Sequence, residues 1–270
     1  MKLFEKNNSL LVWSWFLALM AGLLLRFLHV QVTALLLKAY STGFNLQVFR
    51  ITYQNTGGGT WTDGRVFMVY IFATMLFLFL GLILVNTLEK NRIRNVKVRL
   101  FLTWLAFFSV FLLPLQLLAA VFVVDELGFG LKWFIPEWPA RLVVALACVG
   151  IGLIFRKFWI RLFIRTAPAL DAINEYGKRR RFIRVVLLYA LLPAAAVTAM
   201  FAVSAGTATW LLVNLFQLLV VVAFAVPALR LKTPRIIKTT DTYYLPPLVF
   251  IAMIAAITLV FLLNLFWLPN

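Results

Sequence analysis

Residues 66–88 read VFMVYIFATMLFLFLGLILVNTL, a run without a single charged side chain. The hydrocarbon core of a bilayer is about 30 Å thick and needs about 20 apolar residues in a helix, so this run is long enough to cross it. The rest of the chain is similar, because 64% of its 270 residues are hydrophobic and its mean hydropathy is +0.98. Ordinary globular domains are about half apolar. We therefore predict an all-α polytopic membrane protein and exclude a water-soluble enzyme, a disordered chain and a secreted disulfide scaffold.

Outward from this run, six further apolar windows are candidates for membrane spans. The seven predicted spans cover residues 10–28, 66–88, 100–124, 140–155, 185–204, 209–229 and 245–268. No small-residue cleavage site follows the first window, so we expect it to be retained. Gly150 and Gly152 in the fourth span are predicted to allow close contact with a neighbouring helix. The spans together predict a single integral membrane domain over residues 1–270.

The distribution of charge predicts the orientation of these spans. The chain carries 26 Lys and Arg against 9 Asp and Glu, a formal net charge of +17. Basic loops stay in the cytoplasm during membrane insertion. With the N-terminus inside, the cytoplasmic pieces 1–9, 89–99, 156–184 and 230–244 hold 20 of the 26 cations and a net charge of +15. We therefore predict a cytoplasmic N-terminus and a periplasmic C-terminus in a bacterial inner (plasma) membrane, the assignment to a bacterium resting on the general style of the sequence.

Two connections are predicted to have structure of their own. Residues 44–66 contain two stretches rich in β-branched and aromatic residues around the glycine run 57–59, which predicts an extracytoplasmic β-hairpin. We expect a structured cap there, with a partner-binding or pathway-covering element as the alternative. Residues 156–165, RKFWIRLFIR, carry a basic stripe with a spacing of four and aromatic residues on other faces. This pattern predicts a cytoplasmic interfacial amphipathic helix, with its rings among the acyl chains and its cations on lipid phosphates.

A dense group of cations follows this helix. Together with the stripe, it forms a candidate contact set for anionic phospholipids or for a cytoplasmic partner at 156–184. The set consists of Lys157, Arg161, Arg165, Lys178, Arg179, Arg180, Arg181 and Arg184. Charge that sets topology and contacts lipid is the simpler interpretation, and a specific polyanion site is the alternative. We expect that the protein does not bind nucleic acid, because no aromatic stacking platform beside a groove accompanies the cations.

Residues 171–177, DAINEYG, resemble the coupling-helix loop of ABC importer permeases. The positions that match that pattern are Asp171, Ala172 and Gly177. Ile173 stands where the family has a second alanine, and Pro193 falls a few residues late. In that family the loop docks an amphipathic helix into a cleft on a cytoplasmic ATPase. The resemblance covers a short part of the chain and implies an alternative function, a permease or transporter subunit coupled to a separate ATPase.

Polar residues within the predicted spans form a second candidate site, because such residues are costly in a membrane and usually functional. Arg26 and His29 lie three apart near the outer end of the first span, where Arg26 is long enough to snorkel outwards. Alternatively, this pair binds an anionic group or a carboxylate of another subunit. Amides in spans commonly hydrogen-bond between helices at about 1 kcal/mol each, or they line a polar substrate path. The candidate intramembrane polar site consists of Arg26, His29, Asn214, Gln217 and Gln116.

The chemistry that the sequence lacks narrows the function further. Cys148 and His29 are the only residues of their types, so no disulfide, Cys–His zinc site or bis-histidine haem can form within the chain. No predicted span has Asp or Glu in its interior, and no zinc-protease, serine-hydrolase or phosphate-loop motif is present. We therefore expect no enzyme activity, cofactor or metal. The expected function is a non-enzymatic integral subunit of a multi-protein inner-membrane assembly for transport, secretion or envelope building, in contact with other membrane-protein subunits.

Overall fold

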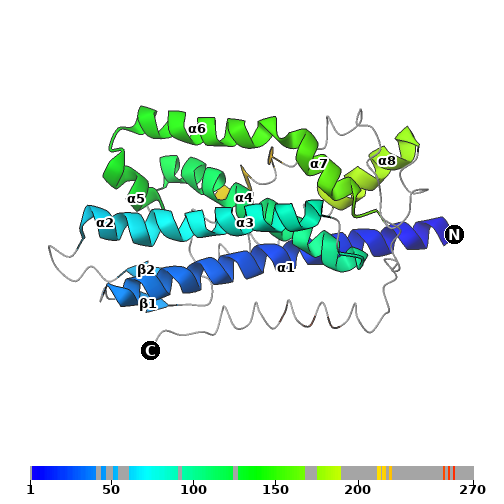
Figure 1. Ribbon diagram of the computed structural model, residues 1–270, viewed down its shortest axis with the longest axis horizontal. Coiled ribbons are helices and arrows are strands. Elements are labelled where there is room, and N and C mark those ends of the chain that lie inside the picture. Colours follow the sequence, from blue (N-terminus) through cyan, green and yellow to red (C-terminus); the bar gives the residue numbers. More distant parts are fainter. Residues whose placement is uncertain are drawn as a thin grey trace.

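A computed structural model of the chain describes most of its N-terminal two thirds. The described residues are 2–40, 44–46, 51–53, 61–90, 93–123, 127–167 and 175–189, with isolated positions within 212–220 and 252–258. This part of the protein is predominantly helical, as predicted, and its long helices run alternately in opposite directions along one axis (Figure 1).

Three helical stretches are long and apolar enough to cross a membrane. They are α1 (Lys2–Ala39), the continuous series of α2 (Asp63–Val66), η1 (Phe67–Phe72) and α3 (Ala73–Glu89), and α4 (Val96–Phe122). A fourth candidate is a pair of helices bent by 119°, made of α5 (Leu127–Phe134) and α6 (Trp138–Ile154). The remaining described helices are α7 (Arg156–Ile164), α8 (Tyr176–Ile183) and η3 (Arg184–Tyr189).

These helices account for the first four predicted spans. The first span is longer than predicted, because α1 continues beyond residue 28 to Ala39. The fourth corresponds to α6, which is long and apolar enough to cross a membrane only when it is counted together with α5. The other three predicted spans, 185–204, 209–229 and 245–268, lie almost wholly outside the described residues, so a total of seven stays a prediction.

The central helix of the described bundle is α4. In its most apolar window 78% of the residues are buried, against 33% in the stretch that contains α3. α4 contacts α1, α3, α5 and α6, and a helix that is apolar on all sides is suited to such a position. α3 and α6 instead expose large apolar side chains, among them Phe79, Ile83 and Ile154. Exposed apolar surface of this kind is expected where helices face lipid hydrocarbon.

Two glycines let neighbouring helices approach α4 closely. A Cβ atom on Gly81 of α3 would lie only 2.9 Å from the Val110 backbone nitrogen, and one on Gly152 of α6 would lie 2.6 Å from Cε1 of Phe111. The predicted packing role is therefore correct for Gly152. For Gly150 no such role is found among the described residues, because a Cβ atom there would meet none of them within 4 Å.

A short antiparallel strand pair follows α1. β1 (Phe44–Leu46) pairs with β2 (Ile51–Tyr53), with Phe44 opposite Tyr53 and Leu46 opposite Ile51. The chain therefore reverses between residues 46 and 51, which is earlier than the glycine run 57–59 around which the hairpin was predicted. A short connection costs less closure entropy than one through the glycine run. The glycine run lies outside the described residues, so the described hairpin is limited to residues 44–53, and its predicted location on the outer side stays a prediction.

Candidate functional site

Two hydrogen bonds identify the opposite ends of the bundle. At one end, Arg99 Nη1 at the start of α4 donates to the Arg165 carbonyl at the end of α7, at 2.9 Å. At the other end, Trp133 Nε1 in α5 donates to Asp63 Oδ1 at the start of α2, at 2.8 Å. Figure 1 shows the start of α1, α7 and α8 at the first end, and α2, α5 and the strands at the second. We call the first the basic end, because the predicted cations of α7 and α8 all lie there.

Three polar side chains from three helices meet inside the bundle. His29 of α1, Thr74 of α3 and Gln116 of α4 are all buried. Thr74 Oγ1 lies 3.1 Å from His29 Nε2 and 3.0 Å from Gln116 Oε1. We call these three residues the polar layer, which brings together two members of the predicted intramembrane site. Two other predicted members, Asn214 and Gln217, lie outside the described residues.

The single proton of the Thr74 hydroxyl decides how the polar layer is bonded. This hydroxyl donates to Gln116 Oε1 or to the Tyr70 carbonyl, which is 3.2 Å away. When it donates to Gln116 Oε1, its lone pairs can accept a hydrogen bond from His29, provided that Nε2 carries the ring proton. The neutral ring with its proton on Nε2 and the doubly protonated ring both satisfy this bond.

Sequence reasoning missed Thr74, although it joins the two predicted residues. A threonine inside a helix can satisfy its hydroxyl on the carbonyl four residues earlier, and Thr74 does so with Tyr70. Its presence in an apolar run therefore gives no signal of a polar partner. One local feature marks the position in the structure, because the π-helical η1 ends directly before α3. Such π-helical turns frequently occur at functional sites.

Arg26 lies one helical turn before His29 and is buried. Its side chain is only 2% exposed, so the prediction that it snorkels outwards is wrong. The reason is the length of α1, which continues for thirteen residues beyond Arg26 to Ala39. At 1.5 Å per residue this distance is about 20 Å, far more than an arginine side chain can span.

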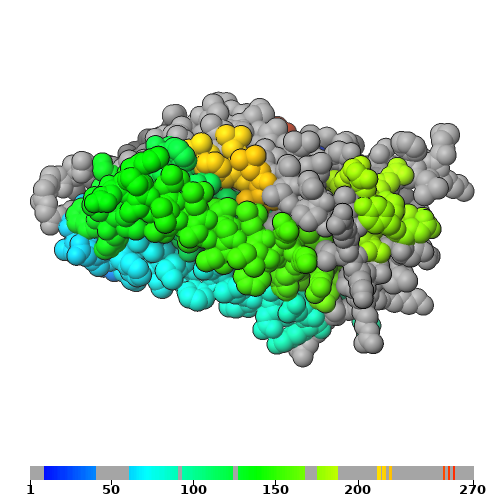
Figure 2. All heavy atoms as spheres, turned by 90° about the horizontal axis from the view of Figure 1, so that it is seen from above, coloured from blue at the N-terminus to red at the C-terminus, as the bar shows by residue number. Residues whose placement is uncertain are grey.

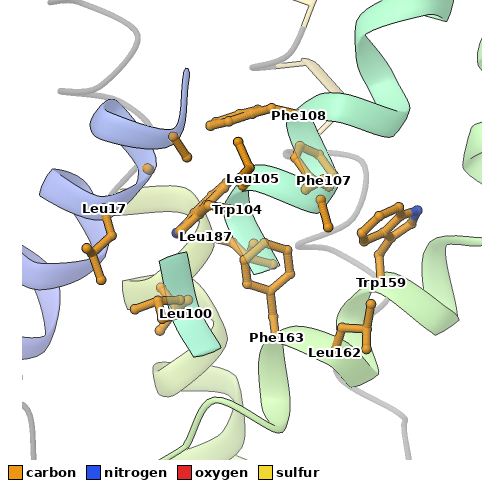
Figure 3. Packing of buried hydrophobic residues seen from close by; sticks show 14 of the residues in the cluster. Leu17, Leu100, Trp104, Leu105, Phe107, Phe108, Trp159, Leu162, Phe163 and Leu187 are labelled. Atoms are coloured by element: carbon orange, nitrogen blue, oxygen red, sulfur yellow. The ribbon is translucent and has the colours of Figure 1, made fainter. Parts of the chain in front are cut away.

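The predicted amphipathic helix at 156–165 is present as α7, but its apolar face does not lie among lipids. Trp159 and Phe163 are 3% and 1% exposed and point towards α4 (Figure 3). The Phe163 ring lies 4.8 Å from the ring of Trp104, and the Trp159 ring lies 5.5 Å from that of Phe107, both edge to face. Such aromatic pairs add about 0.5–1.5 kcal/mol each beyond the area they bury. The predicted insertion of these rings among acyl chains is therefore wrong, because both rings pack against α4 in the core of the bundle.

The predicted basic stripe on α7 is divided by the fold. Lys157 and Arg161 are exposed, as a docking or headgroup contact requires. Arg165 is only half-exposed, and its Nε and Nη1 atoms are buried without a hydrogen-bond partner. The last cation of the stripe therefore has a guanidinium group that is partly buried within the protein.

The cations of α8 project from a helix that is also anchored. Phe182 and Ile183 are buried, while Lys178, Arg180 and Arg181 are exposed and Arg179 and Arg184 are half-buried. Lys178 forms an exposed ion pair with Glu175 at 2.7 Å, an arrangement that contributes little to stability. The following η3 is tied to α1, because Ser14 Oγ donates to the Val186 carbonyl at 2.8 Å. Both basic helices are therefore attached to the transmembrane core.

No catalytic or metal-binding constellation accompanies these features in the part of the chain that the structure describes. There, no three His, Cys, Asp or Glu side chains come together as candidate metal ligands. Comparisons with protein-family models, curated proteins and solved structures find no match to this chain. The polar layer and the basic end are thus the two sites from which a function can be argued.

Proposed function

We propose that this protein is a non-enzymatic integral subunit of a multi-protein inner-membrane assembly, and that its basic end docks an acidic cytoplasmic partner. One observation carries the proposal: exposed cations project from α7 and α8, two helices whose apolar faces are buried in the bundle core. Anionic phospholipids at the membrane surface are the second class of contact for this basic end.

A firmly attached basic surface suits docking for two physical reasons. Clustered positive charge raises the association rate with an acidic surface and selects against basic partners. The aromatic contacts of Trp159 and Phe163 also connect α7 to α4, so a partner bound to α7 acts on the core of the bundle. A loosely tethered basic loop would attract the same partner without this mechanical connection.

The proposed orientation places the basic end in the cytoplasm. The strands β1 and β2 and the α2 end of the bundle then face the periplasm, and seven spans place the C-terminus there as well. A periplasmic reporter fused after Asn270 tests this topology. A signal characteristic of the cytoplasm would refute it.

Affinity purification in a mild detergent tests the docking proposal. We expect a companion protein to co-purify with the wild type and to be lost from a triple variant that removes the exposed α8 cations, K178Q/R180Q/R181Q. The matched control is K38Q/K132Q, which removes two exposed cations remote from the basic end and should retain the companion. A monodisperse monomer without a companion would refute the proposal.

The second candidate function is a permease or transporter subunit driven by a separate ATPase through the loop at 166–184. The polar layer favours this alternative, because hydrogen-bonding side chains inside a transmembrane bundle can line a polar path. Gly177, which belongs to the motif shared with importer permeases, is exposed on α8 with open space around it. A G177C variant can therefore carry a crosslinker without disturbing the fold. Crosslinks to an ATPase and substrate flux in proteoliposomes would favour the permease over the docking subunit.

A further inference from the structure

We propose that Arg165 is the centre of a phosphate-binding site at the basic end, and that an anionic phospholipid supplies the phosphate. This inference rests on the proposed function, because it assumes that the basic end faces an anionic membrane surface. It goes beyond the proposed function because it names the residue that binds the anion, Arg165, and the class of ligand, an anionic phospholipid.

The burial of the Arg165 side chain is the first argument. Its Nε and Nη1 atoms are shielded from solvent, and neither has a hydrogen-bond partner in the described structure. A guanidinium group stays charged in a protein, so Arg165 cannot relieve this situation by losing its proton. Leaving a buried cation uncompensated strongly destabilises a protein, whereas an anion with good hydrogen-bond geometry offsets the cost. An anionic ligand at Arg165 would offset this cost.

A second cation lies beside the backbone of Arg165, and none of the described acidic side chains forms an ion pair with Arg165. Arg99 is buried beside the end of α7, where it donates to the carbonyls of Arg165 and Ile93. The nearest acid along the described chain is Glu175, which pairs with Lys178. An anion at Arg165 would thus be held by a local excess of cations.

Phosphate is the anion that best fits this arrangement. The planar fork of a guanidinium group matches two phosphate oxygens at once. Arg161 and Lys157 lie one and two helical turns earlier on the same stripe of α7 and are exposed. Their flexible side chains can contact the remaining oxygen atoms, while the buried part of Arg165 provides the fixed point of the site.

The position of α7 relative to α6 favours a lipid as the source of the phosphate. The last turn of α6 exposes apolar side chains, with Ile151, Ile154 and Phe155 all prominent and Ile154 76% exposed. The exposed cations begin immediately afterwards, at Arg156. Such a change from apolar to basic surface marks the headgroup level of a membrane. Figure 2 looks onto this face, on which the green residues of α6 and α7 form one continuous surface.

Lipid nanodiscs containing the full-length protein provide the test. Native mass spectrometry measures bound phosphatidylglycerol, and the unfolding temperature is compared between neutral phosphatidylcholine discs and discs that also contain phosphatidylglycerol. We expect R165Q to weaken phosphatidylglycerol binding about tenfold or more, which corresponds to about 1.4 kcal/mol. The control K132Q, which removes an exposed cation remote from the basic end, should retain binding within a factor of about two. R165K keeps the charge but loses the fork, so it should show a smaller loss and serves if R165Q does not fold.

Two further arms identify the source of the anion. Inorganic phosphate added to neutral discs tests a soluble source: stabilisation that depends on Arg165 would confirm a phosphate site filled from solution, and stabilisation by phosphatidylglycerol alone would confirm a lipid site. Asp171 lies outside the described residues, and D171N tests whether it is the counterion. Equal binding by wild type and R165Q, or an Arg165 effect that disappears in D171N, would overturn the inference. Loss of the companion protein with intact lipid binding would instead refute only the docking proposal.

Discussion

The contact between α3 and α4 at Gly81 offers a sharp test of the packing described above. A Cβ atom added at Gly81 would lie 2.7 Å from Val110 Cγ2, 2.9 Å from the Val110 backbone nitrogen and 3.0 Å from Ser109 Cβ. Carbon atoms in favourable contact are about 3.5–4.0 Å apart, so G81A forces the two helices to separate by roughly 1 Å. Backbone cannot rotate out of the way as a flexible side chain can. Overpacking of this kind costs about 1–3 kcal/mol.

The matched control is G150A in α6, where the new methyl group meets nothing within 4 Å. Both variants exchange glycine for alanine inside a helix, so both gain the same helix propensity, about 1 kcal/mol. The difference between them therefore isolates the cost of the α3–α4 contact. We expect the free energy of unfolding of G81A to be about 1–3 kcal/mol lower than that of G150A.

The assay is reversible unfolding in one detergent, followed by tryptophan fluorescence, with the oligomeric state of both variants checked by size-exclusion chromatography. G150A should equal or exceed the wild type in stability. If G81A proved as stable as G150A, the close approach of α3 and α4 would be refuted, together with the central position of α4 that depends on it.

Three other substitutions test separate parts of the structure by the same assay. T74V removes the hydroxyl that joins the polar layer and should lower the free energy of unfolding by about 1 kcal/mol. The control T87V removes an exposed hydroxyl that is bonded within its own helix and should change stability little. Equal losses of stability in the two variants would contradict the hydrogen bonds of the polar layer. R141M should raise the unfolding temperature, because Arg141 is 7% exposed with Nε and Nη1 unpartnered, and a fall would reveal a counterion. F163A removes a buried ring that packs α7 against the core and should lower the free energy of unfolding by about 3–5 kcal/mol. The control F155A removes an exposed ring and should lower it by about 0.5 kcal/mol or less. Similar stability of the two variants would place α7 away from the core.

The helix α7 shows which properties a sequence pattern can predict and which it cannot. The spacing of Lys157 and Arg161 predicted an amphipathic helix, and the helix is there. The same pattern could not say what its apolar face contacts, since Trp159 and Phe163 are equally compatible with acyl chains and with a protein core. Only the turn at Phe155, which brings α7 back against α4, decides between them.

The intramembrane site shows the same limit. Polarity within apolar windows was enough to single out His29 and Gln116, because a membrane makes each such residue expensive. Their connection through Thr74 depends on the relative rotation of α1, α3 and α4, which no single helix encodes. The burial of Arg26 depends likewise on the full length of α1.

The sequence by itself determined that this protein is helical and apolar enough for a membrane, and it predicted which connections are basic. Those properties follow from composition and from charge counted along the chain, both of which are local quantities. The tertiary structure alone decided that α4 is central, that α7 and α8 pack against the core, that Arg26 is buried, and that Nε and Nη1 of Arg165 are shielded from solvent. These facts depend on contacts between residues far apart in the chain, and apolar side chains give the same signal in a sequence whether they face lipid or protein.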